Sequence, residues 1–266
     1  MENLIRLTAA LGIFSLMIAW EYLSPRRLMP VRRKQRWPVN LGLAATNMLI
    51  LRISVGGLAG LSAVTAAEHG YGLLNLLAVP GWLAIIITLL GLDIAIYGQH
   101  IAAHKWPVLW RLHQIHHTDM AIDATTAIRF HPLEILLSLA YKVLCIALIG
   151  AHPLAVMIFE IMLNGAATFN HSNIQLSPAL DNKLRRLIVT PDMHRIHHST
   201  LPSETDSNYG FSLSCWDRLF RTYKAEPSLP QTIMPIGLPT FRNPSELGFW
   251  SLLVLPFKPL RKPKRR

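Results

Sequence analysis

Residues 93–117 have the sequence DIAIYGQHIAAHKWPVLWRLHQIHH, and the five histidines in this stretch decide the fold and the chemistry that we predict. His100 and His104 are four residues apart, so a helix places both imidazoles on one face, about one turn from each other. The second box, HQIHH, starts at His113, and its spacing also keeps three side chains on one side of a helix. The whole chain of 266 residues has only 12 histidines, so this density indicates a metal site.

A third histidine box, HRIHH at residues 194–198, repeats the spacing of the second box. Eight imidazoles are too many for the coordination shell of one ion, so the three boxes predict a centre of two metal ions. Neutral imidazole binds iron, zinc, copper and nickel, and the boxes alone leave that choice open. Isolated histidines such as His69 and His152 are better interpreted as surface or core residues. The predicted ligands are His100, His104, His113, His116, His117, His194, His197 and His198.

The composition indicates a membrane protein. Hydrophobic residues make up 51% of the chain and charged residues only 15%, which excludes an intrinsically disordered protein. A formal net charge of +11 is compatible with nucleic-acid binding, but the basic residues here stand beside apolar segments, as is typical of the membrane surface. We therefore expect no nucleic-acid partner. The two cysteines, Cys145 and Cys215, are too few for a disulfide framework or an iron–sulfur cluster.

Apolar stretches predict four to five membrane segments. Residues 4–22 predict an uncleaved membrane helix, because no small-residue cleavage site follows them. Residues 41–67 and 82–97 predict further segments, and residues 133–168, interrupted by the sequence GAHP, predict a helical hairpin. The basic residues within 26–36 place the loop after the first segment in the cytoplasm by the positive-inside rule.

This topology leaves 23 of the 26 Lys and Arg residues in cytoplasmic segments, the exceptions being Arg6, Arg52 and Lys142. The active site is then expected on the cytoplasmic side of a bacterial inner membrane or of the endoplasmic reticulum. The basic end of the chain predicts a membrane-surface anchor, although KPKRR at 262–266 also fits an endoplasmic-reticulum retrieval pattern. We expect one all-α integral membrane domain, 1–266, with a cytoplasmic histidine-rich cap. Its expected parts are the N-terminal membrane helices (1–97), the first and second histidine boxes (98–132), the membrane hairpin (133–169), the third-box region (170–248) and the basic tail (249–266).

Several polar residues near the boxes are further candidates for the site. Asp93 shares a helix face with the first box, so we expect its carboxylate to hydrogen-bond the outer nitrogen of a metal-binding imidazole. We also expect Asp93, Tyr97 and Asn164 to line the approach of a substrate. His171, at the end of the hairpin, is the best candidate for a ninth ligand. His131 precedes a proline, where a role at the start of a helix is as well supported as metal binding.

The sequence between the boxes carries further motifs: WRLH at 110–113, FHPLE at 130–134, NH at 170–171, TPDMH at 190–194, NYG at 208–210 and WDRLF at 216–220. Together with the boxes, these motifs resemble the sterol desaturase branch of the fatty acid hydroxylase superfamily. The resemblance covers about residues 88–224. The chain departs from the family pattern at Arg221, where members commonly have glycine.

The resemblance implies an integral-membrane, non-haem di-iron enzyme that uses O2 and electrons to hydroxylate or desaturate a lipid. By that resemblance, the eight box histidines bind two Fe ions, and His171 is similar to an additional ligand position in some members. The motifs of flavin, haem and iron–sulfur domains are absent, so we expect a separate electron donor, a ferredoxin- or cytochrome-like protein with its reductase. The basic residues Arg111, Lys183, Arg185 and Arg186 would steer an acidic donor or face anionic lipid headgroups.

The alternative is a membrane metal-binding or transport protein without oxygen chemistry. Such a protein would place ligands along a pathway within the bilayer, whereas the predicted boxes lie at one membrane surface. A zinc hydrolase is disfavoured, because the sequence has no HExxH signature. The motifs leave open which lipid and which carbon react, and whether the product is hydroxylated or desaturated.

Overall fold

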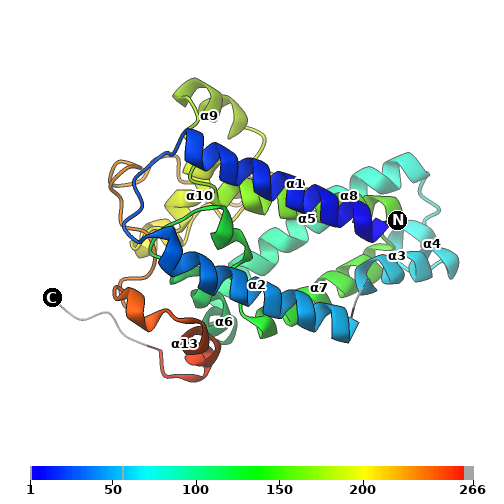
Figure 1. The fold of residues 1–266 in the computed structure, drawn as a ribbon. Coiled ribbons are helices and arrows are strands. Elements are labelled where there is room, and N and C mark those ends of the chain that lie inside the picture. The colour runs from blue at the N-terminus through cyan, green and yellow to red at the C-terminus, as the bar shows by residue number, and fades with distance from the viewer. Residues whose placement is uncertain (1, 56, 261–266) are drawn as a thin grey trace.

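A computed structural model describes residues 2–55 and 57–260 of the chain (Figure 1). Every regular element in these ranges is a helix, as the sequence predicts. In chain order the helices are α1 (Glu2–Leu23), α2 (Arg33–Val55), α3 (Leu58–Glu68), α4 (Leu73–Leu76), α5 (Gly81–Lys105), α6 (Pro107–His117), η1 (Ala124–Ile128), α7 (Pro132–Ile149), α8 (Pro153–His171), α9 (Pro178–Leu184), α10 (Pro191–His197), α11 (Pro202–Thr205), α12 (Cys215–Leu219), η2 (Pro244–Glu246), α13 (Phe249–Val254) and η3 (Leu255–Phe257).

Four helices, α1, α5, α7 and α8, are long and apolar enough to cross a membrane. Their apolar parts have 18 to 25 residues, which matches a bilayer core of about 30 Å. α8 packs against both α1 and α5, and α5 also packs against α7. Figure 1 shows α1, α2, α5, α7 and α8 running along the length of the molecule, with the shorter helices α6, α9, α10 and α13 gathered at one end. The predicted all-α membrane fold is confirmed.

Residues 41–67 do not form the single membrane span that the sequence predicts. α2 ends at Val55 and α3 begins at Leu58, after Gly57, whose φ of +84° is a left-handed conformation that glycine adopts without steric penalty. α2 starts in a basic stretch at Arg33, so its first turns are too polar for the hydrocarbon core. α3 has only 11 residues, too few to cross a bilayer.

The predicted hairpin, α7 and α8, has three residues between its helices. Gly150 ends α7 with a φ of +70°, and Pro153 starts α8, where its missing N–H leaves no hydrogen bond unmade. A Cβ on Gly72 would clash with the backbone nitrogen of Gly150, so the loop before α4 packs directly on this turn. Both helices pack against α3 and α5, and α8 returns the chain to the end of the molecule where α5 ends.

Buried polar contacts attach the first two helices to the histidine end. Arg36 on α2 donates hydrogen bonds to Asp119 (2.5 Å) and Asp123 (2.7 Å), and all three side chains are buried. Glu21 on α1 accepts hydrogen bonds from the backbone N–H groups of Ala124 and Asn173. Arg36 therefore holds α2, and Glu21 holds α1, against the segments that carry the histidines.

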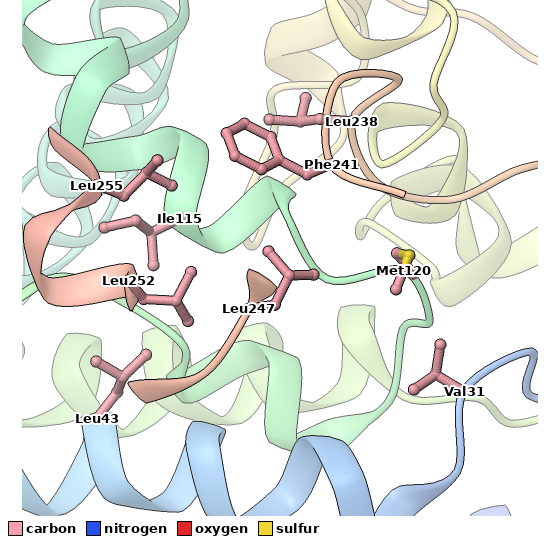
Figure 2. Packing of buried hydrophobic residues seen from close by; sticks show 9 residues of the cluster. All are labelled: Val31, Leu43, Ile115, Met120, Leu238, Phe241, Leu247, Leu252 and Leu255. Carbon is pink, nitrogen blue, oxygen red and sulfur yellow. The ribbon is translucent and has the colours of Figure 1, made fainter. Parts of the chain in front are cut away.

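Figure 2 shows how the C-terminal segment packs on the histidine end. Leu252 on α13 and Leu255 lie against Leu43 of α2 and Ile115 of α6, and all four side chains are buried. The apolar part of the predicted membrane-surface anchor is therefore also a packing element of the protein. Residues 261–266, with the retrieval-like sequence and most of the basic tail, lie outside the described residues.

Candidate metal centre

The first two histidine boxes face each other because the chain turns sharply between them. The first box occupies the last turns of α5, and α6 starts two residues later at Pro107. Trp106 between the two helices has an extended backbone (φ −95°, ψ 119°), since a residue before proline is kept out of the helical region. The second box folds back on the first, with 4.9 Å between the ring centroids of His104 and His113.

Five imidazoles form one compact group, with one candidate ligand atom from each lying within 4.8 Å of the others. The side chains are buried, and none of the five Nε2 atoms has a hydrogen-bond partner among residues 2–55 and 57–260. Buried polar atoms without a partner are costly, so five such nitrogens in one place fit a bound cation. This five-histidine group consists of His100, His104, His113, His117 and His197.

Hydrogen bonds to Nδ1 select the tautomer of three of these imidazoles. The Nδ1 atoms of His100 and His197 lie 2.8 Å from the backbone carbonyl oxygens of Tyr209 and Ser207, respectively. A carbonyl oxygen only accepts, so the proton sits on Nδ1 and the lone pair of Nε2 points into the group. His113 makes the equivalent bond, of 2.6 Å, to a glutamate carboxylate. Such outer partners orient metal-binding imidazoles.

A second, four-histidine group consists of His116, His171, His194 and His198. The Nε2 atom of His171 lies 3.0 Å from the Nε2 atoms of His116 and His194, and 3.2 Å from that of His198. His171 Nδ1 is 2.7 Å from the carbonyl oxygen of Ala167, so it carries the proton and Nε2 holds a lone pair. Three neighbouring nitrogens cannot all donate to that lone pair. Spacings near 3.0 Å do fit ligands at right angles around one ion, with metal–nitrogen bonds of about 2.1 Å.

The two groups adjoin, because the second and third boxes each contribute to both. His116 and His117 are consecutive but belong to different groups, and so are His197 and His198. The rings of His117 and His198 stack across the boundary, with 4.5 Å between centroids. The arrangement therefore has room for two neighbouring metal ions, each facing imidazoles from several helices.

Burial favours the neutral form of five imidazoles in the second and third boxes. It lowers the pKa of His116, His117, His194 and His198 well below the usual value, and the neighbouring imidazoles lower it further. Burial also lowers the pKa of His197, to about 3. Neutral imidazole is the form that binds metals, so these five side chains are in the ligand state at pH 7.

A cavity of about 940 Å³ joins the five-histidine group to the membrane part of the protein. His100 and His113 line one end of the cavity, and Leu4 of α1, Leu51 of α2 and Leu58 of α3 line it at the end of the molecule remote from the histidines. This volume is near the upper end of the range for sites that bind small molecules. Most other lining side chains are apolar, including Ile96, Phe130, Ile135, Leu139, Ile161, Leu163 and Phe211.

Of the three residues predicted to line the substrate approach, Asn164 lines the cavity and Asp93 and Tyr97 do not. Among residues 2–55 and 57–260, Asp93 has no hydrogen bond to an imidazole: its Oδ2 accepts hydrogen bonds from Trp216 Nε1 (2.8 Å) and from the backbone N–H of Leu213 (3.2 Å). This corrects the expected partner of Asp93. The reason is that Asp93 and Tyr97 face α12 and the segments beside it, whereas the cavity lies against another side of α5.

The remaining polar candidates have other partners. The hydroxyl group of Tyr97 lies 2.8 Å from Thr222 Oγ1, and the amide of Asn164 donates to the carbonyl oxygen of Glu160 (2.8 Å). His131 caps α7, since its Nδ1 accepts a hydrogen bond from the backbone N–H of Leu133, and it belongs to neither histidine group. The role of His131 at the start of a helix is therefore the one that the geometry supports.

A family model described as fatty acid hydroxylase matches residues 85–222, about half of the chain, and the match includes all nine grouped histidines. The chain belongs to the fatty acid hydroxylase family. The superfamily resemblance inferred from the motifs is thereby confirmed.

Curated relatives of this family member act on lipids, according to their names. The chain is 32% identical to an ornithine lipid hydroxylase of Rhizobium tropici over 66% of its own length and 52% of the relative's. It is 32% identical to the alkylglycerol monooxygenase of Xenopus tropicalis over 53% of its length and 30% of the relative's, and 25% identical to the cholesterol 25-hydroxylase of Rattus norvegicus over 54% and 47%. The chain thus spans about half or less of these relatives. No solved structure matches it significantly.

Two carboxylates support the site in this family member although the sequence did not predict a role for them. Glu134, part of the FHPLE motif, accepts the hydrogen bond from His113. Asp217 of the WDRLF motif accepts hydrogen bonds from the backbone N–H groups of Tyr209 (2.8 Å) and Gly210 (2.9 Å), and so holds the loop whose carbonyl receives His100 Nδ1. Both residues belong to motifs that the sequence shows, but their roles could not be predicted because the histidines that they support lie far away in the sequence.

The expected basic face for an electron donor is not one continuous surface. Arg111 donates hydrogen bonds to the backbone carbonyls of Pro256 and Lys258, and the buried Arg185 is paired with Asp181. α6, which carries Arg111, and α9 lie on opposite sides of the molecule in Figure 1. Of the four predicted residues, Lys183 and Arg186 are the exposed ones.

Proposed function

We propose that this protein is a membrane-bound di-iron oxygenase that hydroxylates or desaturates a lipid with O2 and electrons from a separate donor. The observation that carries the proposal is the position of the five-histidine group at the end of a large, mainly apolar cavity between membrane helices. The names of the relatives, which are lipid hydroxylases and monooxygenases, support the same class of reaction and substrate.

The two histidine groups would each hold one iron ion. All eight predicted box ligands would serve, with His171 as the ninth ligand, since its Nε2 faces three other imidazole nitrogens. When bound, the irons would supply the oxygen chemistry that no protein side chain can provide. Asp93, Tyr97 and Asn164 would act around this site as supporting residues, the first two by holding the segment of residues 213–222 and Asn164 at the cavity wall.

The residues of this chain would position the metals and the substrate. Glu134 and the carbonyls of Ser207 and Tyr209 orient imidazoles, and the apolar cavity wall excludes water from a bound hydrocarbon chain. We propose that the histidine end faces the cytoplasm. The basic residues within 26–36 lie at that end of the molecule, where α1 ends and α2 begins, and basic residues beside membrane helices are typical of the cytoplasmic side. The donor would be a soluble ferredoxin- or cytochrome-like protein reached from that side.

The decisive experiment compares the detergent-purified protein with His197→Ala and with His69→Ala, a control outside both groups. Metal content, O2 consumption with a reducing system and the mass of added membrane lipids are measured. We expect about two irons per chain and a lipid mass gain of one oxygen or loss of two hydrogens in the wild type and the control. His197→Ala should lose the lipid oxidation and about one of the two irons. If the protein binds metal and moves it across vesicle membranes but consumes no O2 with any of several electron donors, the result would instead support a transport protein.

A further inference from the structure

The three basic residues that depart from the positive-inside distribution, Arg6, Arg52 and Lys142, line the same cavity that reaches the five-histidine group. They come from three different helices, α1, α2 and α7, so their convergence is a tertiary feature. Glu160 on α8 lines the cavity as well, and Arg52 is the exposed member of the three basic residues. We name Arg6, Arg52, Lys142 and Glu160 the charged cluster.

The charged cluster has more positive than negative charge. Glu160 is paired with both Arg6 and Lys142, the latter with a distance of 2.5 Å between Nζ and Oε1. The cluster therefore has three cationic groups and one carboxylate. Ionisable groups within a membrane helix bundle are costly and mark sites of function, and excess positive charge in a cavity favours an anion.

The charged cluster lies far from the histidines along the helices. Lys142 is eight residues after Glu134, the partner of His113, which corresponds to about 12 Å of helix. Glu160 is eleven residues before His171, which corresponds to about 17 Å. Arg6 and Arg52 each lie about one turn from the ends of α1 and α2 that are remote from the histidines.

We propose that the charged cluster binds the anionic group of the lipid substrate, a phosphate or a carboxylate, while the hydrocarbon chain extends through the cavity to the five-histidine group. Lys142 and Glu160 lie about 12 to 17 Å from the histidine end along their helices, and the hydrocarbon chain bridges this separation, so oxidation falls on a carbon of the chain and not on the headgroup. The site of oxidation rests on the proposed function, whereas the anion site does not.

The anion site is tested by binding without an electron donor, so that no turnover occurs. The probes are radiolabelled dioleoyl phosphatidic acid against dioleoylglycerol, and oleate against oleyl alcohol, in neutral detergent with the full chain. We expect the wild type to bind at least one anionic lipid about tenfold more tightly than its neutral counterpart. Equal affinity within both pairs would overturn the proposal. The pair that shows the preference identifies phosphate or carboxylate.

Charge variants test the cluster in opposite directions. Lys142→Met and Arg52→Gln should reduce the preference for the anionic lipid several-fold, and Glu160→Gln should increase it, because it removes the competing carboxylate. Arg52→Gln does not disturb the pairs of Glu160, so it remains informative if the other variants fold poorly. Lys34→Met, which removes an exposed charge at the histidine end of α2, should leave the preference unchanged. Equal effects on charged and neutral lipids would show a purely structural cluster.

Fragmentation mass spectrometry of the product then locates the oxidation. A hydroxyl group or double bond on the hydrocarbon chain supports the proposed orientation, and an oxygen on the glycerol or headgroup overturns it. A preserved anion preference without any oxidised product would count against the oxygenase function alone. Failure of the anion-site proposal and failure of the oxygenase proposal are therefore distinguishable.

Discussion

Glu134, in the first turn of α7, accepts a hydrogen bond of 2.6 Å from Nδ1 of His113, although 21 residues separate them in the chain. The contact joins the second histidine box to the membrane helix that also carries Lys142. It directs Nε2 of His113 into the five-histidine group, and it links the metal centre to the wall of the cavity.

We predict that Glu134→Gln lowers metal occupancy or activity by about 10- to 100-fold, because the outer partner of a metal-binding imidazole sets its orientation and basicity. Iron content and lipid oxidation are measured together on the purified variant. Glu226→Gln, which changes an exposed carboxylate outside the site, is the matched control. Unchanged metal content and rate in Glu134→Gln would remove Glu134 from the supporting role.

His171→Ala and His197→Ala should each lose one metal ion and retain the other, because they belong to different histidine groups. Metal analysis should then give about one iron per chain in each variant and close to none in the double variant. Loss of both ions from either single variant would show that the groups do not bind independently. Full occupancy in His171→Ala would contradict the ninth ligand.

Gly210→Ala should destabilise the loop that supports His100. An added Cβ would lie 2.7 Å from Asp217 Oδ2 and 2.9 Å from the carbonyl oxygen of Leu213, so the backbone must shift. We expect a loss of about 1–3 kcal/mol in the free energy of unfolding, with reduced metal content. Thermal unfolding in detergent measures the loss. Gly98→Ala, whose Cβ would meet no atom within 4 Å, should not destabilise the protein.

Arg221→Gly should stabilise the protein by about 1 kcal/mol. Arg221 has a φ of +61°, in the left-handed region that disfavours residues with a Cβ, and it is exposed. The family resemblance places glycine at this position, and the backbone conformation gives the physical reason. A rise in the unfolding temperature with unchanged lipid oxidation is the expected result. Arg221→Ala keeps the Cβ and should give no comparable rise.

Local spacing accounts for what could be predicted. The i, i+4 spacing of His100 and His104 places two imidazoles on one helix face whatever surrounds the helix, and runs of apolar residues indicate membrane helices by length alone. The break in residues 41–67 was predictable only in part, because the glycines there are compatible with a continuous helix as well as with the observed left-handed Gly57. The partner of Asp93 was mispredicted, because a helix face does not specify which neighbour it meets.

The helical membrane class, the number of imidazoles and the family can all be inferred from the order of the amino acids. The packing of the helices, in contrast, divides the histidines into groups of five and four and brings Glu134 to His113. It also places Arg6, Arg52 and Lys142 in the cavity that reaches the histidines. The physical reason is distance along the chain. Periodicity depends on a few neighbouring residues, whereas the direction of a lone pair and the charge of a cavity depend on how helices remote in sequence pack together.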